Sequence, residues 1–316
     1  MANVAYPGAT GMVGVTEGAN FIPELWSDDI IAAYKTSLVM GNLVSKINHV
    51  GKKGDTIHIP TPTRGTSFAK AENVAVTIQA NTEGVTNVSI DQHWEYSRLI
   101  EDIVEVQALD SLRNFYTDDA GYAIAKRIDD TIMAQFESLN GGSASGTGTW
   151  TGGVIGGDGV TAYDPTANTN TGNGTALLAA GIRKAMQTLD DSDVPMEGRK
   201  FVIPPIDRNT ILGITGYTSA DFVSGKPTVT GTIGDLYGMD VVVTSNCPTE
   251  VAADASTNYR VALMFHKDCI VFAEQLTIRS QAQYKQEYLA DLMTSDAIFG
   301  VAELRDDAGL CLISPA

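Results

Sequence analysis

The chain has 316 residues and a formal net charge of −17, and charged residues make up 19% of it. This acidity argues against sequence-independent binding to nucleic acid, which needs a basic surface to displace counterions. No apolar run approaches the roughly 18 residues that a membrane-spanning helix requires. The three cysteines (Cys247, Cys269 and Cys311) are far apart and lack metal-ligand spacing, so we expect reduced thiols in a protein made in a cytoplasm.

The first residues, 1 to about 24, are mostly Gly, Ala, Val and Thr without periodicity. We expect an extended arm that cannot fold alone. A short helix is predicted after it, with Ser27 as the N-cap. Phe21 and Trp26 are large apolar residues beside a segment with no core of its own. They dock either on the body of this chain or on a neighbouring chain, and the neighbour is slightly favoured.

Residues 44–95 alternate apolar and polar side chains. VSKINHV and DTIHIPTP are predicted strands with residues 51–55 as the turn between them, and VTIQANTEGVTNVSIDQHWEYSRLI alternates again after a polar stretch that contains Arg64 and Lys70. Two strand pairs with a poorly apolar tip predict a long hairpin that projects from the body. An isolated hairpin is marginal in water, so this one needs a partner surface. The alternative is an ordinary edge hairpin folded back on its own domain.

The stretch from Val106 to Leu139 carries apolar residues in steps of three and four along one helical face. It contains no proline, and Asn140-Gly141-Gly142 supplies a helix stop. A helix of this length would measure about 50 Å at 1.5 Å per residue. We expect it to lie across a sheet, whereas the alternative is a long surface helix of an ordinary α/β enzyme.

Residues 140–174 are rich in Gly and Thr and predict a surface loop. A helix over residues 175–189 follows, capped by Thr175, and then a buried strand at GRKFVIPP, a short helix at IDRNTILGI and a strand at LYGMDVVVTSNCP. This order predicts a compact α/β unit. The strand-like segments from Tyr259 onward are expected to form the sheet under the long helix, so that one domain is built from chain before and after the α/β unit.

No catalytic, cofactor-binding or metal-binding constellation is convincing. Gly172-Asn173-Gly174 lacks the third glycine of a dinucleotide fingerprint, and Ser224-Gly225-Lys226 lacks the first glycine of a phosphate-binding loop. The remaining candidates are scattered or lack the required spacing. Four histidines are interpreted as ordinary strand residues: His49, His58, His93 and His266. Four carboxylates form a weak Ca²⁺ candidate: Asp190, Asp191, Asp193 and Glu197. The carboxylates of the long helix are expected to face solvent or a basic strip: Asp118, Asp119, Asp129 and Asp130. Lys70 is expected to make an ion-pair contact.

The order of these parts resembles the major capsid proteins of tailed bacteriophages, which have the HK97-like fold. The stretches that carry the resemblance are FIPELWSDDIIAAYKTSLVMGNLV, KKGDTIHIPTPTRG and HWEYSRLIEDIVEVQALDSLRNFYTDDAGYAIAKRID, and they are most similar to coat proteins of T7-like short-tailed phages. The resemblance implies an α+β fold. Its parts would be an N-terminal arm at 1–48, an extended hairpin (the E-loop) at 49–95, a peripheral (P) domain at 96–174 with the spine helix and the Gly/Thr-rich loop, an axial (A) domain at 175–259, and C-terminal P-domain strands at 260–316.

The same resemblance implies a structural protein that self-assembles into the icosahedral shell around a double-stranded DNA genome. Its partners would be copies of itself in hexamers and pentamers, a scaffolding protein, a portal protein and a decoration protein, with no sequence-specific nucleic-acid binding and no membrane. It would be made in the host cytoplasm and reside in the virion. We expect Phe21, Trp26, Arg64, Phe68 and Lys70 to contact neighbouring copies, and the loop at 216–226 to lie at a capsomer centre or contact.

Two other functions stay open at this point. An encapsulin-like nanocompartment shares the fold but encloses enzymes. A cytoplasmic α/β enzyme is disfavoured by the lack of a site and by two segments without a core of their own.

Overall fold

A computed structural model describes residues 38–62, 64–80, 83–103, 112–140, 154–160, 176–214, 235–251 and 258–315. The expected helix after Ser27, the side chains of Phe21 and Trp26 and the loop at 216–226 lie outside these ranges. Thr175, the expected cap of the second helix, also lies outside them.

The predicted long helix is present as α3 (Leu112–Ala134), which continues into a short 3-10 turn, η2 (Gln135–Ser138). Residues 104–111, the first part of the predicted helix, are not described. The helix buries Ala120, Ile124, Ile132 and Met133 along one face, as the apolar spacing predicts. Asn140 has a φ of 55°, so the left-handed residue that ends the segment lies where the sequence placed a stop.

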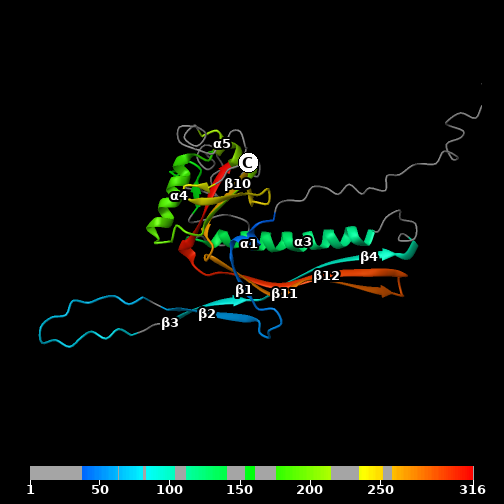
Figure 1. Cartoon of the computed structure of the whole chain (residues 1–316), viewed down its shortest axis with the longest axis horizontal. Coiled ribbons are helices and arrows are strands. Elements are labelled where there is room, and N and C mark those ends of the chain that lie inside the picture. The colour runs from blue at the N-terminus through cyan, green and yellow to red at the C-terminus, as the bar shows by residue number, and fades with distance from the viewer. Residues whose placement is uncertain are drawn as a thin grey trace, which may run out of the picture.

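Helix α3 lies along one face of a four-stranded sheet, called the spine sheet below, with the order β1-β11-β12-β4 (Figure 1). Its strands are β1 (Ser45–Asn48), β4 (Gln92–Glu101), β11 (Ile270–Lys285) and β12 (Ala290–Glu303). Contacts between helix and sheet include Arg127 and Trp94, whose guanidinium carbon and ring centroid are 3.9 Å apart, and the Tyr96 hydroxyl, which donates to Asp119 at 2.9 Å. The predicted arrangement of a long helix across a sheet is therefore present.

The predicted hairpin is built from β2 (Thr56–Pro62) and β3 (Glu83–Ser89), which pair antiparallel, with residues 64–80 as the distal loop. It extends away from the body beyond the end of the spine sheet (Figure 1). One part of the expectation was wrong, because β1 does not pair with β2. It pairs parallel with β11, from Ser45 opposite Val271 to Asn48 opposite Glu274. Alternation marks a half-buried strand but does not reveal its partner.

A second sheet, the α/β sheet, has the order β5-β13-β10-β6-β8-β7, with β9 paired to β10. The predicted unit is present in it as α4 (Ala179–Asp191), β6 (Arg199–Ile203), α5 (Pro205–Leu212) and β8 (Met239–Val243). Strands β6 and β8 are parallel neighbours, as a strand–helix–strand crossover requires. The remaining strands are β5 (Val154–Gly156), β7 (Asp235–Leu236), β9 (Thr249–Val251), β10 (Asn258–His266) and β13 (Gly309–Pro315).

The C-terminal strands divide between the two sheets, and this corrects the expectation that all of them lie under the long helix. Strands β11 and β12 belong to the spine sheet, whereas β10 and β13 pair with each other in the α/β sheet. Residues 261–265 of β10 form an unbroken apolar run that is almost fully buried. Such a run suits the centre of a sheet that is covered on both faces, whereas a sheet with a solvent-facing side favours alternation. Strand β5 is a further correction, because it lies in the Gly/Thr-rich stretch that was expected to be a loop.

The two sheets share one large apolar core at the end of the spine helix. The rings of Phe136, in η2, and Phe265, in β10, meet edge to face with their centroids 4.8 Å apart. Helix α1 (Met40–Leu43) adds the fully buried Met40 to the same core. The connection from β12 to β13 passes through η3 (Asp306–Ala308), whose Asp306 carbonyl accepts a hydrogen bond from the Asn140 amide at 3.0 Å. The core therefore fixes where the hairpin and the N-terminal segment leave the body.

Candidate intersubunit surface

The base of the hairpin is anchored on the spine sheet by a small apolar cluster. Val88 is fully buried in β3, and Ile90, which follows it, is 8% exposed. They pack with Val271 and Ala273 of β11. The Gln275 side-chain amide donates to the carbonyl oxygens of Lys52 and Gly54, at 3.0 and 2.9 Å, and so fixes the turn that leads into β2. The hairpin therefore leaves the body in a defined direction.

The distal loop of the hairpin, residues 64–80, has no comparable support. All of its residues are exposed, including four large apolar side chains: Phe68 at 59%, Val74 at 59%, Val76 at 69% and Ile78 at 89%. The two sides of the loop are bridged by the Gln79 side chain, which bonds to both the amide and the carbonyl of Thr66. A concentration of exposed apolar side chains on a projecting segment is typical of a surface that another molecule covers.

Three of the five predicted contact residues lie on this loop. Arg64, Phe68 and Lys70 are all exposed, and the Lys70 ammonium donates to the neighbouring Ala71 carbonyl at 2.5 Å. A hollow of about 300 Å³ lies between the two sides of the loop and includes Phe68 and Lys70 in its lining. The other two residues, Phe21 and Trp26, lie outside the described part of the chain. Contact of any of the five with a neighbouring copy stays a prediction.

The distal loop of the hairpin has a charge opposite to that of the chain as a whole. Residues 64–80 contain two basic side chains, Arg64 and Lys70, and one acidic one, Glu72, for a net charge of +1 in a chain whose total is −17. Opposite charges on two surfaces increase the rate of their encounter and restrict how they pair. Because the remaining residues are strongly acidic in sum, the distal loop is electrostatically suited to the body of another copy.

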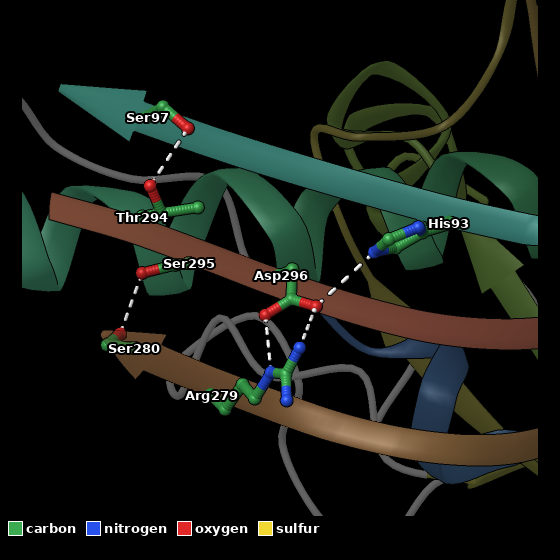
Figure 2. Close-up of polar contacts among 7 residues, drawn as sticks. All are labelled: His93, Ser97, Arg279, Ser280, Thr294, Ser295 and Asp296. Carbon is green, nitrogen blue, oxygen red and sulfur yellow. Dashed lines mark hydrogen bonds and ion pairs between the residues drawn. The ribbon is translucent and has the colours of Figure 1, made fainter. Parts of the chain in front are cut away.

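The face of the spine sheet opposite α3 carries a polar cluster centred on Asp296 of β12. The Arg279 guanidinium donates to both carboxylate oxygens, at 2.7 Å from Nε and 3.0 Å from Nη2, and His93 Nε2 lies 3.3 Å from Oδ2 (Figure 2). The hydrogen bonds from Arg279 hold the pKa of Asp296 below its ordinary value, and burial only partly opposes this. Sequence reasoning missed the cluster, since it joins the consecutive strands β11 and β12 to His93 of β4, 203 positions before Asp296.

The spine sheet also has open edges. Strand β1 pairs only with residues 271–274, so among the described strands nothing covers the outer side of β11 from Leu276 to Lys285. Strand β4 forms the opposite edge over its full length, Gln92–Glu101. Unpaired strand edges are templates for pairing with another chain unless they are covered.

The other sequence candidates have structural roles. His266 is buried, with Nε2 2.9 Å from the Glu197 carbonyl, and Asp190 accepts a hydrogen bond from the buried Arg199 at 2.7 Å. Asp129 was expected to face solvent or a basic strip and is instead only 3% exposed, because its side chain points toward the segment before β1. The Gly172-Asn173-Gly174 and Ser224-Gly225-Lys226 motifs lie outside the described residues.

Within the ranges that the structure describes, no arrangement of side chains indicates a catalytic or ligand-binding site. They contain no group of three or more His, Cys, Asp or Glu side chains arranged to hold a metal ion. They also contain no helix long and apolar enough to cross a bilayer. The described residues instead form an exposed, partly apolar distal loop whose charge is opposite to that of the whole chain. Such surfaces favour association with another molecule.

Comparison with known proteins gives a consistent result. A family model described as phage capsid protein matches residues 41–311. No curated protein sequence matches the chain.

Solved structures with the same fold cover nearly the whole chain. A chain from Mycobacterium phage Che8 is 23% identical, with 93% of this chain and 97% of that one covered and a TM-score of 0.71. The capsid structure of the cyanophage P-SCSP1u is 17% identical, with 99% of each chain covered and a TM-score of 0.76. The mature capsid of bacteriophage PhiM1 is 13% identical, with 99% and 96% covered and a TM-score of 0.70. At these identities the likeness establishes the fold, which is the predicted HK97-like α+β fold.

Proposed function

This chain belongs to the phage capsid protein family, and from that premise we propose that it forms hexamers and pentamers in which the arm and hairpin of each copy lie on neighbouring copies. It is a structural, non-enzymatic major capsid protein of a tailed phage, and many copies of it build the shell of the virion. The α/β enzyme is thereby set aside. The similarity to T7-like phages in particular stays a prediction.

The observation that carries the proposal is the exposed distal loop of the hairpin. Leaving Phe68, Val76 and Ile78 in water forgoes roughly 1.5 to 3 kcal/mol of burial for each side chain. A neighbouring copy that covers them recovers this free energy in the assembled shell. The open edges of the spine sheet support the same conclusion, because they offer unpaired backbone groups to a second chain. Extended contacts of this kind are typical of obligate assemblies.

The division into domains follows the sheets. We assign the N-terminal arm to the residues before β1, the hairpin to 49–91, and the spine helix with β1, β4, β11 and β12 to the peripheral domain, so that β1 and the start of β4 leave the expected ranges 1–48 and 49–95. The axial domain at 175–259 is extended to include β10 and β13, which pair within its sheet. This assignment differs from the expected 260–316 boundary because the strand pairing crosses it.

The remaining partners are those that assembly and DNA filling of a shell require. A scaffolding protein would guide assembly in the host cytoplasm, a portal protein would admit double-stranded DNA, and a decoration protein would bind outside. The net charge of −17 suits a shell that does not bind its DNA. Its acidic side chains repel the DNA phosphates at distances within a Debye length, which is about 8 Å at physiological salt. No sequence-specific contact with DNA is required.

Substitution on the distal loop tests the assignment. The double variant Phe68→Ser, Ile78→Ser is expected to keep the melting temperature of the unassembled subunit and to lose shells in negative-stain microscopy. Val160→Ser is a matched control, because Val160 is 88% exposed but lies away from the hairpin, between β5 and α4. Shells at wild-type yield from the double variant would contradict the proposal.

Charge reversal on the same loop tests the electrostatic part. Arg64→Glu, Lys70→Glu should slow assembly followed by light scattering, and the wild-type rate should fall as salt is added, because screening weakens attraction between exposed charges. Arg183→Glu, on the exposed side of α4, is the control. Equal rates for the two charge-reversed variants would contradict the attraction between hairpin and body.

A further inference from the structure

Helix α1 lies near the start of the described chain, where the N-terminal segment joins the body. It has four residues, Met40–Leu43, and its N-cap residue Val39 offers no side chain that could bond to the exposed backbone N–H groups. The first N–H groups of any helix lack intrahelical partners. A helix this short is not stable by itself, so something outside it must fix its first turn.

The spine helix supplies the missing acceptor from 90 positions away in the chain. Asp129 Oδ2 accepts a hydrogen bond from the Val39 amide at 2.9 Å, and Oδ1 accepts one from the Gly41 amide at 3.3 Å. Both carboxylate oxygens are used, so the pair of bonds fixes the orientation of the first turn as well as its position. The side chain is 3% exposed, which removes competition from water.

The position of this carboxylate is costly, which argues that it has a specific task. Burial raises the pKa of Asp129, the amide donors of Val39 and Gly41 oppose that rise, and the neighbouring Asp130 adds to it. Asp130 faces elsewhere, with Oδ1 accepting from the Asn246 side chain at 2.8 Å and Oδ2 3.1 Å from the Lys126 ammonium. Two adjacent carboxylates on α3 therefore hold two different segments, the start of α1 and the loop after β8.

Helix α1 and the chain after it are also held to the body by other contacts. Met40 and Val44 are buried in the main core, the Ser45 amide donates to the Lys267 carbonyl at 2.9 Å, and β1 then joins the spine sheet. The direction in which residues before Val39 leave the body is set at the first turn of α1. Of the side chains that the structure describes, Asp129 is the one shown accepting hydrogen bonds from the backbone N–H groups of that turn.

We propose that Asp129 is a positioning residue for assembly, whose carboxylate caps α1 from the spine helix and so sets the direction of the N-terminal arm. The proposal rests on the proposed function in one respect, namely that the arm reaches neighbouring copies. The cap itself belongs to the single subunit and can be measured without assembly.

Hydrogen exchange on unassembled full-length subunits tests the cap. Asp129→Ala should increase the exchange rate of the amides at positions 39 and 41 by about tenfold or more, because their acceptor is gone. Asp129→Asn keeps one side-chain oxygen and replaces the other with an NH2 donor, so it can accept from only one of the two amides. One of the amides at positions 39 and 41 should therefore stay near the wild-type rate, and the other should exchange as fast as in Asp129→Ala. Ile132→Ala is the matched control, because it removes a fully buried side chain from the same helix without touching the cap.

Assembly rates then test the consequence. At a temperature where all variants are folded, Asp129→Ala should form shells more slowly than Ile132→Ala, and Asp129→Asn, which keeps one of the two cap hydrogen bonds, should assemble at an intermediate rate. Unchanged exchange in Asp129→Ala would overturn the cap. Faster exchange with wild-type assembly would overturn the positioning role and leave the proposed function intact. Failure of the wild type to form shells would count against the proposed function, whereas the exchange result would still decide the cap.

Discussion

The α-carbon of Gly300, in β12, lies directly against the carbonyl oxygen of Ser89 at the end of β3. A methyl group at this position would overlap the Ser89 carbonyl and would also lie 3.0 Å from the α-carbon of Ile90. Both neighbours are backbone atoms that no rotamer change can move. The absence of a side chain on Gly300 therefore allows the base of the hairpin to rest on the spine sheet.

The first prediction follows from this contact. Gly300→Ala should destabilise the subunit by about 1 to 3 kcal/mol, because an added methylene in a packed site forces the backbone to shift. The hairpin should move as well, so its distal loop would reach a neighbouring copy less well and shell yield should fall. Thermal unfolding and negative-stain microscopy measure the two effects.

A glycine in open surroundings is the control for this substitution. Gly121, in α3, has no atom within 4 Å of the position that a Cβ would occupy. Gly121→Ala should therefore stabilise the subunit by about 1 kcal/mol through helix propensity alone. A loss of stability in both variants would remove the special role assigned to Gly300.

The second prediction concerns Asp207, a buried carboxyl group on α5. Burial raises its pKa to about 6, and the Ser314 hydroxyl offsets this only in part. The unfolded chain loses this proton near the ordinary pKa of 3.8, whereas the folded chain keeps it until about pH 6. Stability should therefore fall as pH rises from about 4 to 6 and stay lower above that range, by an amount on the order of 2 to 3 kcal/mol.

Asp207→Asn checks this pH dependence by making the site permanently neutral. The variant should be more stable than the wild type in urea at pH 7.5 and equal to it near pH 4. Asp191→Asn, on the exposed side of α4, should change little at either pH. A wild-type stability that rises steadily between pH 4 and pH 7, with the same slope in Asp207→Asn, would contradict the prediction.

The third prediction concerns Asp296, whose contribution to stability depends on pH in the opposite direction from that of Asp207. Arg279 holds the pKa of Asp296 below its ordinary value of 3.8, so the ion pair stabilises the fold above that pH, and the contribution is lost as pH falls through the lowered pKa. Asp296→Asn should lower the melting temperature at pH 7, and the difference from the wild type should shrink in acid. The effect should be modest and reduced by salt, since the Arg279 side chain is half exposed.

Glu95 provides a contrasting variant for the same cluster. It lies directly opposite Asp296 in the register of β4 and β12. Like charges at directly opposite positions destabilise a strand pair. Glu95→Gln should therefore leave the melting temperature at pH 7 unchanged or raise it slightly. If both variants lowered it equally, the effect would reflect general sheet disruption rather than the ion pair.

The fourth prediction is protection from protease on assembly. In unassembled subunits trypsin should cut after the exposed Arg64 and Lys70, within the range 60–72, and cuts by less specific proteases should also fall in 1–24 and 140–174. Assembly should slow cleavage in 1–24 and 60–72 by about tenfold or more, because a covered loop must open before it is cut. Equal cleavage of 60–72 in shells and free subunits would show that the distal loop is not covered.

Local pattern alone predicted several parts of this protein. The steps of three and four between apolar residues located the spine helix, since a helix turns once every 3.6 residues, and Asn140 marked its end. Alternation with a polar tip identified the hairpin, and the run from GRKFVIPP to LYGMDVVVTSNCP predicted the α/β unit. The marginal stability of an isolated hairpin also predicted a partner surface, whereas the contact residues Arg64, Phe68 and Lys70 were expected from the family resemblance.

Contacts between distant residues were decided only by the tertiary structure. The pairing of β1 with β11, the assignment of β10 and β13 to the α/β sheet, and the approach of His93 to Asp296 depend on register between strands far apart in the chain, which side-chain periodicity does not encode. Asp129 shows the limit most clearly, because its sequence neighbours indicate an exposed helix position while its hydrogen bonds go to residues 90 and 88 positions away. The sequence determines which faces of each helix and strand are apolar or polar, and three-dimensional packing determines which segment contacts each face.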